Sequence, residues 1–234
     1  MDDSKKIAYT GLRSDVISLI TIKPKFVLDV GCSNGVFLEF VKNKLGANFA
    51  VGIEFDSELI LEARKKADKI IEADLDYLKI DALGEEQFDL IVLADVLEHT
   101  KEPASVLREV LKAATNDAVI IISLPNIQHW TAIKNLVIGV WPQRERGLFD
   151  KTHLRFFTLR SIIDLATECG LQIEKIRRNY RILDKPSSKI NRLSRVFGFW
   201  PFMPYFTYHR HSAPHQPLPE YNATYRCPSS SSRA

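Results

Sequence analysis

The fold of this chain is set by the stretch Val27-Leu-Asp-Val-Gly-Cys-Ser-Asn-Gly35. The run from Phe26 to Val30 is short, apolar and rich in β-forming residues, which predicts a buried strand. Gly31 and Gly35 allow the tight turn that follows, and they allow backbone to approach a ligand closely. Apolar residues from 36 to 45 then recur at helical spacing. The stretch therefore predicts a strand, a glycine turn and a helix.

The same alternation of strands and helices continues on both sides of this stretch. Strands are predicted at 49–53, 69–71, 88–93, 118–123, 171–180 and 205–208, and helices at 9–20, 57–67, 103–114 and 159–168. Strands that are apolar on both faces and alternate with helices indicate a parallel sheet covered by helices on each side. The predicted fold class is α/β.

Length and composition favour one main domain. The chain has 234 residues, of which 45% are hydrophobic and 26% charged, as in ordinary globular proteins. Its three cysteines lie far apart and form no Cys-x-x-Cys pair, which argues against a disulfide framework or a cysteine zinc site. No apolar run approaches the ~20 residues that span a bilayer. We therefore expect a cytoplasmic protein without a transmembrane segment.

We divide the chain into a lead-in helix within residues 1–24, a main domain over 25–211 and a disordered tail over 212–234. The periodic pattern loosens over 126–157, which predicts a lid or substrate-side insertion. Residues 181–204 form a basic segment with interleaved aromatic residues. This segment is either a solvated surface or a contact for an anionic partner.

Acidic residues follow three of the predicted strands, at the edge where parallel sheets bind ligands. A carboxylate at Asp29 repels a pyrophosphate but suits a ligand that carries ammonium and sulfonium groups. Glu54 is placed to accept hydrogen bonds from ribose hydroxyls. Asp74 is placed to accept one from an adenine amino group, with Leu75 packing beside the ring. The pattern predicts S-adenosylmethionine rather than a dinucleotide.

Four stretches, 27–35, 51–56, 73–75 and 88–99, resemble the successive motifs of class I S-adenosylmethionine-dependent methyltransferases. The resemblance covers residues 10 to 180, and it implies a Rossmann-like, seven-stranded, mostly parallel sheet with a reversed last strand. Ser33 stands where glycine is commoner, a change that we expect to cost little because serine is compact. With Gly35 of the turn added, the expected cofactor-binding residues are Asp29, Gly31, Cys32, Gly35, Glu54, Asp74, Leu75 and Ala94.

Methyl transfer requires an aligned acceptor and a group that takes its proton. Histidine suits the second task because its pKa of ~6.5 lies close to neutrality. His153 lies three residues after Asp150 in an apolar setting, and we expect His153, Asp150 and His99 to be catalytic. The alternative is that Asp150 and His153 only shape a turn. His129, beside Trp130, is expected to be structural or part of a pocket wall.

A metal site is a further possibility on the acceptor side. A helix that begins near Asp95 would place Asp95, Glu98 and His99 on one face, where with His153 they could bind Mg²⁺ or another divalent ion. The segment resembles the Glu-x-x-Glu-His metal motif of ubiquinone-biosynthesis O-methyltransferases and of small-RNA 3′-terminal 2′-O-methyltransferases, although Asp95 is shorter than glutamate. Metal-free relatives also carry Leu-Glu-His, so both interpretations stay open.

Two further stretches resemble narrower families. Residues 123–130 resemble MetW proteins of methionine biosynthesis, and residues 147–158 resemble methyltransferases of cell-surface glycan assembly. The favoured function is O-methylation of a hydroxyl on a small molecule or glycan. The sequence pattern predicts no particular oligomeric state. One alternative is a metal-assisted RNA 2′-O-methyltransferase that uses the basic segment. Another is a MetW-like, non-catalytic partner protein that binds S-adenosylmethionine.

Overall fold

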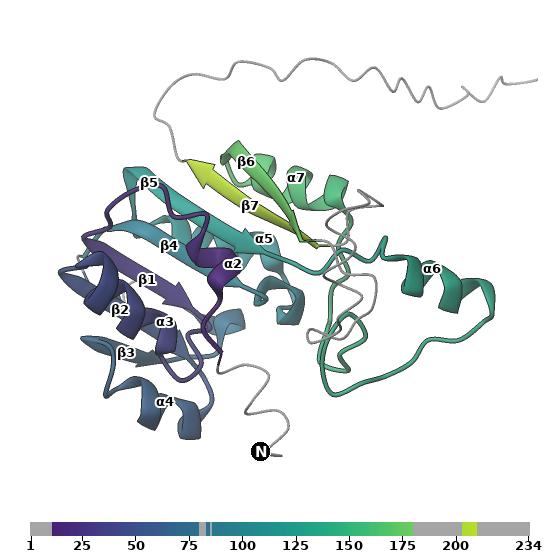
Figure 1. Ribbon diagram of the computed structural model, residues 1–234, viewed down its shortest axis with the longest axis horizontal. Helices are drawn as coiled ribbons and strands as arrows, with labels where there is room; N and C mark the ends of the chain where they lie inside the picture. The colour runs from purple at the N-terminus through teal and green to yellow at the C-terminus, as the bar shows by residue number, and fades with distance from the viewer. Residues whose placement is uncertain (1–10, 80–82, 85, 180–202, 210–234) are drawn as a thin grey trace, which may run out of the picture.

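The computed structural model describes residues 11–79, 83–84, 86–179 and 203–209 (Figure 1). The predicted basic segment at 181–204 therefore lies almost entirely outside the described residues, and the predicted tail at 212–234 lies wholly outside them. In the described part of the chain, no helix is long and apolar enough to cross a membrane.

The strands form one sheet in the order β3-β2-β1-β4-β5-β7-β6. Their bounds are β1 Phe26–Val30, β2 Phe49–Glu54, β3 Lys69–Glu72, β4 Phe88–Ala94, β5 Ala114–Ser123, β6 Gln172–Asn179 and β7 Met203–His209. Strands β1 to β5 pair in parallel, whereas β7 runs antiparallel to both β5 and β6. The predicted α/β class with a mostly parallel sheet is confirmed.

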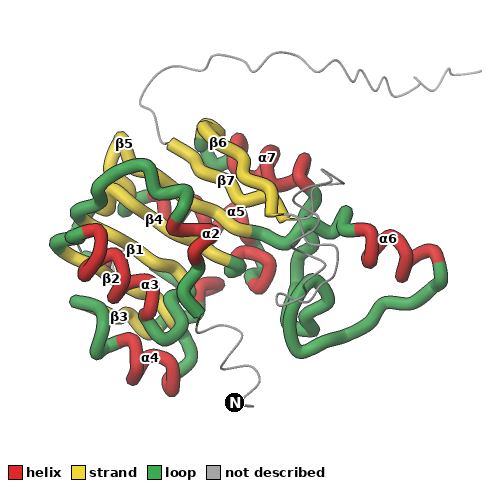
Figure 2. The backbone as a smooth tube through the Cα atoms, viewed as in Figure 1, coloured by secondary structure: helices red, strands yellow, loops and turns green. Residues whose placement is uncertain are grey.

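Helices lie on both sides of this sheet (Figure 2). Their bounds are α2 Ser14–Ile17, α3 Val36–Phe40, the π-helix η1 Val41–Leu45, α4 Ser57–Ala63, the 3₁₀ turns η2 Leu75–Tyr77 and η4 Leu97–His99, α5 Pro103–Leu111, α6 Trp130–Val137 and α7 Leu159–Glu168. Helices α2, α3 and α4 contribute to one core cluster, and α5 and α7 contribute to the other.

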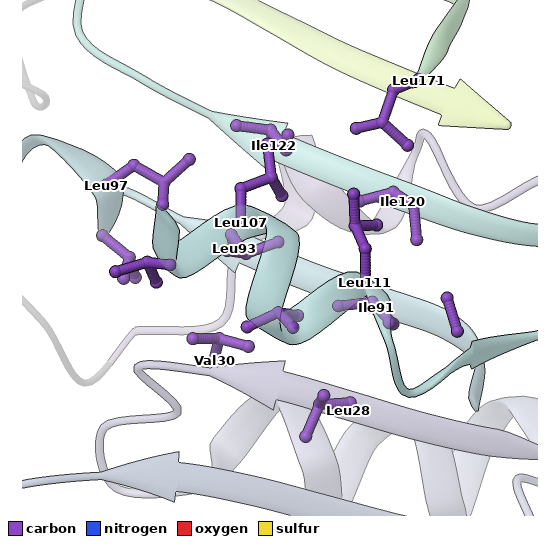
Figure 3. Packing of buried hydrophobic residues seen from close by; sticks show 14 of the residues in the cluster. Leu28, Val30, Ile91, Leu93, Leu97, Leu107, Leu111, Ile120, Ile122 and Leu171 are labelled. Atoms are coloured by element: carbon purple, nitrogen blue, oxygen red, sulfur yellow. The ribbon is translucent and has the colours of Figure 1, made fainter. Parts of the chain in front are cut away.

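The two cores follow from the alternation of side chains along each strand. In β1, Val27 belongs to the cluster with α2 and α3, and its neighbour Leu28 belongs to the cluster with α5 and α7. Figure 3 shows Leu107 and Leu111 of α5 packed over strand residues that include Leu28 and Ile120. Because successive residues of a strand point to opposite faces, strands buried on both faces need apolar residues at nearly every position.

Several helix bounds differ from the prediction. The helix expected at 57–67 ends at Ala63, and its N-cap is Asp56. The Asp56 carboxylate accepts hydrogen bonds from the backbone amides of Glu58 and Leu59, which is the usual role of an N-cap side chain. The lead-in helix is shortened to α2 within the described residues.

The helix predicted after Thr158 is confirmed. The Thr158 side chain accepts from the Ser161 amide, and the Ser161 hydroxyl accepts from the Thr158 amide. This reciprocal capping box satisfies donors at the start of α7. The preceding stretch 126–157 contains α6, which is set apart from the sheet at the right of Figure 1.

Candidate cofactor and acceptor site

The glycine turn after β1 is held tightly from two sides. Gly31 has φ +72°, and a Cβ there would lie 2.6 Å from Cγ2 of Val96 in the loop after β4. Gly35 has φ +75°, and a Cβ there would lie 2.9 Å from the Ala63 Cα at the end of α4. Left-handed backbone and close packing both select glycine at these positions. The turn is thus fixed between β4 and α4.

Ser33 is more constrained than the sequence suggested. Its φ is +51°, in the left-handed region that residues with a Cβ avoid. We expected a small cost in stability because serine is compact, but the left-handed backbone of Ser33 adds strain that the sequence does not show. The Ser33 hydroxyl is buried and has no hydrogen-bond partner within the described residues. The Ser33 amide donates to Glu54 Oε2 at 2.8 Å, and this bond helps to hold the strained residue in place.

Glu54, at the end of β2, is buried with 7% exposure. Besides Ser33, the amides of Phe55 and Asp56 donate to its Oε1 at 2.9 and 3.1 Å. The carboxylate therefore organises the glycine turn and the loop after β2. A carboxylate has about four acceptor sites, so the three backbone bonds leave capacity for a ligand hydroxyl, as the sequence predicts.

Asp29, near the end of β1, is 5% exposed. Its pKa is raised from 3.8 to about 8, chiefly by burial and then by the nearby Glu54 carboxylate, while the Arg13 guanidinium opposes both effects. Burial disfavours the charged carboxylate, whereas a cation beside it would restore the charge. This strand end is therefore suited to a cationic ligand.

The remaining predicted cofactor residues lie around this turn. The Asp74 carboxylate accepts from the Asp76 amide at 3.0 Å and so caps η2. Leu75 is half-buried against one core cluster, and Ala94 is half-buried against the other. The Cys32 side chain is buried toward β2, where a Cβ on Gly52 would lie 2.4 Å from its Sγ. The Cys32 amide donates to the Ile53 carbonyl at 3.0 Å, and the Cys32 carbonyl accepts from the Gly35 amide at 3.0 Å.

Asp95 departs from the prediction. No helix begins there; Asp95 has φ +57°, and the 3₁₀ turn η4 starts at Leu97. The Asp95 carboxylate accepts from Ser123 Oγ at 2.6 Å and from Arg13 Nη1 at 2.7 Å. The predicted helical face with Glu98 and His99 is wrong because the left-handed residue turns the chain before the helical turn begins.

Glu98, His99 and His153 do come together. Their ligand atoms lie within 4.8 Å of one another, a grouping found among the described residues without Asp95. The backbone carbonyl of Glu98 accepts from the amides of Leu154 and Arg155 at 2.8 and 3.0 Å. These two bonds fasten the segment that carries His153 against η4, which is why residues far apart in sequence share one cluster.

Two polar atoms in this cluster lack partners. Glu98 Oε2 and His153 Nδ1 are buried without a hydrogen bond in the described part of the chain, and the two side chains are 1% and 5% exposed. Burial, and then the neighbouring Asp95, raises the pKa of Glu98 well above its usual value. Burial and the adjacent His99 lower the pKa of His153. Native proteins seldom leave buried polar atoms unpaired, so the cluster has the character of a binding or reaction site.

Thr152 also belongs to the site, although the sequence did not indicate it. Its hydroxyl donates to Asp150 Oδ1 at 2.6 Å and lies 3.0 Å from His99 Nδ1. A hydroxyl has one proton, so His99 Nδ1 must itself donate to Thr152, whose carbonyl oxygen is also 3.3 Å away. Asp150 and Thr152 thereby fix the tautomer of His99 and leave its Nε2 with the lone pair. Asp150 acts on His99 through Thr152, and its backbone carbonyl also accepts from the His153 amide at 3.1 Å.

A comparison with known families agrees with this fold. Residues 13–198 match the family model described as methionine biosynthesis protein MetW. The chain belongs to the MetW family. The resemblance of residues 123–130 to MetW proteins is thus confirmed, and the class I methyltransferase resemblance is confirmed at the level of fold.

Individual relatives of this MetW-family chain are more distant. It is 31% identical over 107 residues to a ubiquinone biosynthesis O-methyltransferase of Neisseria meningitidis serogroup A. The aligned stretch covers 44% of this chain and 44% of the relative. An S-adenosylmethionine-dependent methyltransferase from Mesorhizobium loti superposes with a TM-score of 0.62 at 16% identity, covering 86% of this chain and all of the other. The plantazolicin methyltransferase BpumL in complex with SAH superposes with a TM-score of 0.56 at 18% identity, covering 89% and 82%.

Within the MetW-like stretch, His129 has a structural role. It is the N-cap of α6, and its Nδ1 accepts from the Thr131 amide at 3.2 Å. Its ring stacks on Trp130 with a centroid separation of 6.2 Å. His129 therefore anchors the start of α6, while His99 and His153 form the acceptor-side cluster.

Proposed function

We propose that this MetW-family chain is an S-adenosylmethionine-dependent methyltransferase that methylates a hydroxyl of a small molecule or glycan. One observation carries the proposal: the buried Asp29 at the end of β1 and the Glu98–His99–His153 cluster after β4 lie at the ends of two adjacent parallel strands. The contact of Gly31 with Val96 joins these two ends. Ligands of open α/β sheets bind at such carboxyl ends.

The residues divide into two groups by chemistry. On the cofactor side, Asp29 offers a carboxylate to a cation, Glu54 offers acceptor capacity to ribose hydroxyls, and Asp74 offers an acceptor to adenine. When bound, S-adenosylmethionine supplies an activated methyl group. On the acceptor side, the lowered pKa of His153 keeps its imidazole uncharged near pH ~7. The imidazole would take the hydroxyl proton as the acceptor oxygen bonds to the methyl carbon and the sulfur–methyl bond breaks, with the demethylated cofactor as the leaving group.

The test is methyl transfer from labelled cofactor to a panel of phenols, aliphatic alcohols, sugars and short RNAs. We expect turnover on one hydroxyl class and a fall in kcat of about 10² or more for His153→Gln, the usual contribution of a general base. The dissociation constant of the cofactor should not change in this variant. Arg160→Ala, at an exposed position on α7, is the control. An unchanged kcat in His153→Gln would remove His153 from the catalytic role.

Metal-assisted transfer is a second candidate, favoured by the clustering of Glu98, His99 and His153. Glu98 Oε2 and His153 Nδ1, which have no hydrogen bond within the described residues, are atoms that could coordinate a metal ion. A set of two imidazoles and one carboxylate suits Mn²⁺, Fe²⁺ or Zn²⁺ better than Mg²⁺, which prefers oxygen ligands. Asp95 does not fit this set because Arg13 and Ser123 hold its carboxylate.

The same panel, together with metal analysis, separates the metal-assisted form, the RNA form and the non-catalytic partner protein. Retention of about one metal ion after dialysis, lost in Glu98→Gln, supports the metal-assisted form. Turnover that survives chelation without loss rejects it, and turnover confined to RNA selects the RNA form. Cofactor binding without turnover on any acceptor selects the non-catalytic partner protein.

A further inference from the structure

Exposed apolar side chains are concentrated in one part of the molecule. Among the described residues, fifteen large hydrophobic side chains are exposed, and nine of them lie between Trp130 and Phe156. Scattered exposed apolar residues are normal on a protein surface, whereas a concentration of them marks an interaction site. We call residues 130–141, which hold α6 and the turn after it, the apolar arm.

Most large apolar side chains of the arm are exposed. Within α6, Ala132 is the buried residue. Leu136, Val137 and Ile138 are 61%, 81% and 59% exposed. Figures 1 and 2 show α6 apart from the sheet and from the helices that cover it. The arm therefore presents apolar surface that the rest of the described chain does not cover.

The apolar residues of the arm recur at helical spacing. Ile133, Leu136 and Val137 take positions i, i+3 and i+4 of α6, and Val140 follows at i+7 just beyond the helix; all four are exposed. Such a stripe packs either into a protein groove or into the headgroup–acyl boundary of a bilayer, where basic residues accompany the apolar face.

The charges around the arm give the sign of the partner. Positions 135–143 carry no charge and are flanked by Lys134 and Arg144. Five basic and two acidic residues lie within 126–157, a net +3 that equals the formal net charge of the whole chain. Of the two acids, Asp150 is buried and Glu145 pairs with Lys151. Basic residues beside an inserted apolar segment are attracted to anionic lipid headgroups.

We infer that the apolar arm docks on an anionic lipid surface. Val137 and its neighbours enter the headgroup–acyl boundary, and Lys134 and Arg144 lie at the level of the headgroups. The arm continues toward the acceptor cluster: the Trp141 ring lies 5.3 Å from Phe156, and the Phe156 ring lies 6.4 Å from His153. Docking would thus bring the rim of the site to the membrane, although the docking itself does not rest on the proposed function.

Co-sedimentation of the full chain with vesicles tests this inference. Vesicles of phosphatidylcholine alone are compared with vesicles of phosphatidylcholine and phosphatidylserine, without cofactor or acceptor. We expect binding to the mixed vesicles, weakened by salt, and at least about tenfold weaker binding for Val137→Asp and for Leu136→Asp. Leu61→Asp is the matched control, because Leu61 on α4 is also exposed, at 62%, and its vesicle binding should equal that of the wild type.

Each other outcome overturns the inference. Absence of binding to the mixed vesicles excludes the lipid surface, and equal binding to both kinds of vesicle excludes the electrostatic part. Equal losses in Val137→Asp and Leu61→Asp remove the arm as the docking element. A dimer in solution that Val137→Asp dissociates, without vesicle binding, assigns the arm to a second copy of the chain. Because both arm positions are exposed, far-ultraviolet circular dichroism should match the wild type in all three variants.

Discussion

Arg13 and Asp95 are 82 positions apart in sequence, yet the Arg13 Nη1 lies 2.7 Å from the Asp95 Oδ2. The Arg13 Nη2 also donates to Ser123 Oγ at 3.2 Å. These bonds tie the lead-in segment before α2 to the ends of β4 and β5. The same guanidinium opposes the rise in the pKa of both Asp29 and Glu98, so one cation influences both halves of the site.

Removal of this link should destabilise the protein measurably. The Arg13 and Asp95 side chains are 31% and 28% exposed, and we expect Arg13→Ala to lower the free energy of unfolding by roughly 1 kcal/mol. The control is Arg160→Ala, whose pair with Asp164 is 77% and 57% exposed and should contribute less than about 0.5 kcal/mol. Urea denaturation measures both. Equal effects of the two variants would show that the Arg13 link is no stronger than a surface pair.

The raised pKa of Asp29 should make the free energy of unfolding fall as the pH rises. Its pKa is about 8 in the folded state and 3.8 as the reference, so the folded state holds a proton that the unfolded state releases between these values. Stability from this group is complete below pH 3.8 and is lost as pH rises toward 8, with a slope of at most about 1.4 kcal/mol per pH unit. Asp29→Asn should flatten this slope in urea titrations at several pH values. A wild-type slope equal to that of Asp29→Asn would contradict the raised pKa.

Replacement of Ser33 by glycine should stabilise the protein. Because Ser33 has φ +51°, Ser33→Gly should raise the free energy of unfolding by roughly 0.5–1 kcal/mol. Gly31→Ala is the contrasting variant, because its Cβ would meet Val96 Cγ2 at 2.6 Å and its φ is +72°. We expect Gly31→Ala to be clearly destabilising in thermal denaturation. A loss of stability in Ser33→Gly would mean that the buried serine hydroxyl contributes more than the backbone strain costs.

Replacement of Thr152 should change the tautomer of His99. Thr152→Val removes the hydroxyl that bonds both Asp150 and His99, so the proton of His99 should distribute between Nδ1 and Nε2. Nitrogen-15 chemical shifts of the imidazole report this distribution. Thr152→Ser should restore the wild-type shifts. Unchanged shifts in Thr152→Val would assign the tautomer to the Thr152 carbonyl, 3.3 Å from His99 Nδ1.

The sequence predicts the cofactor side better than the acceptor side for a topological reason. The ends of neighbouring parallel strands meet at one edge, so Asp29 and Glu54 could be placed together once the strands were recognised. Asp95 could not be placed in this way, because its left-handed backbone and its partner Arg13 depend on tertiary contacts. Thr152 gave no signal, since a threonine between Asp150 and His153 resembles an ordinary loop residue until the distance to His99 is known.

We expect the acidic ends of β1 and β2 to bind S-adenosylmethionine. Isothermal titration calorimetry of the wild type, Asp29→Ala and Glu54→Ala measures this binding, at a pH about one unit above the pKa of about 8 so that the Asp29 carboxylate is charged. Saturable one-to-one binding is expected for the wild type and loss of binding for both variants, with Arg160→Ala unchanged. Tight binding retained by both Asp29→Ala and Glu54→Ala, or no binding by the folded wild type, would contradict this expectation.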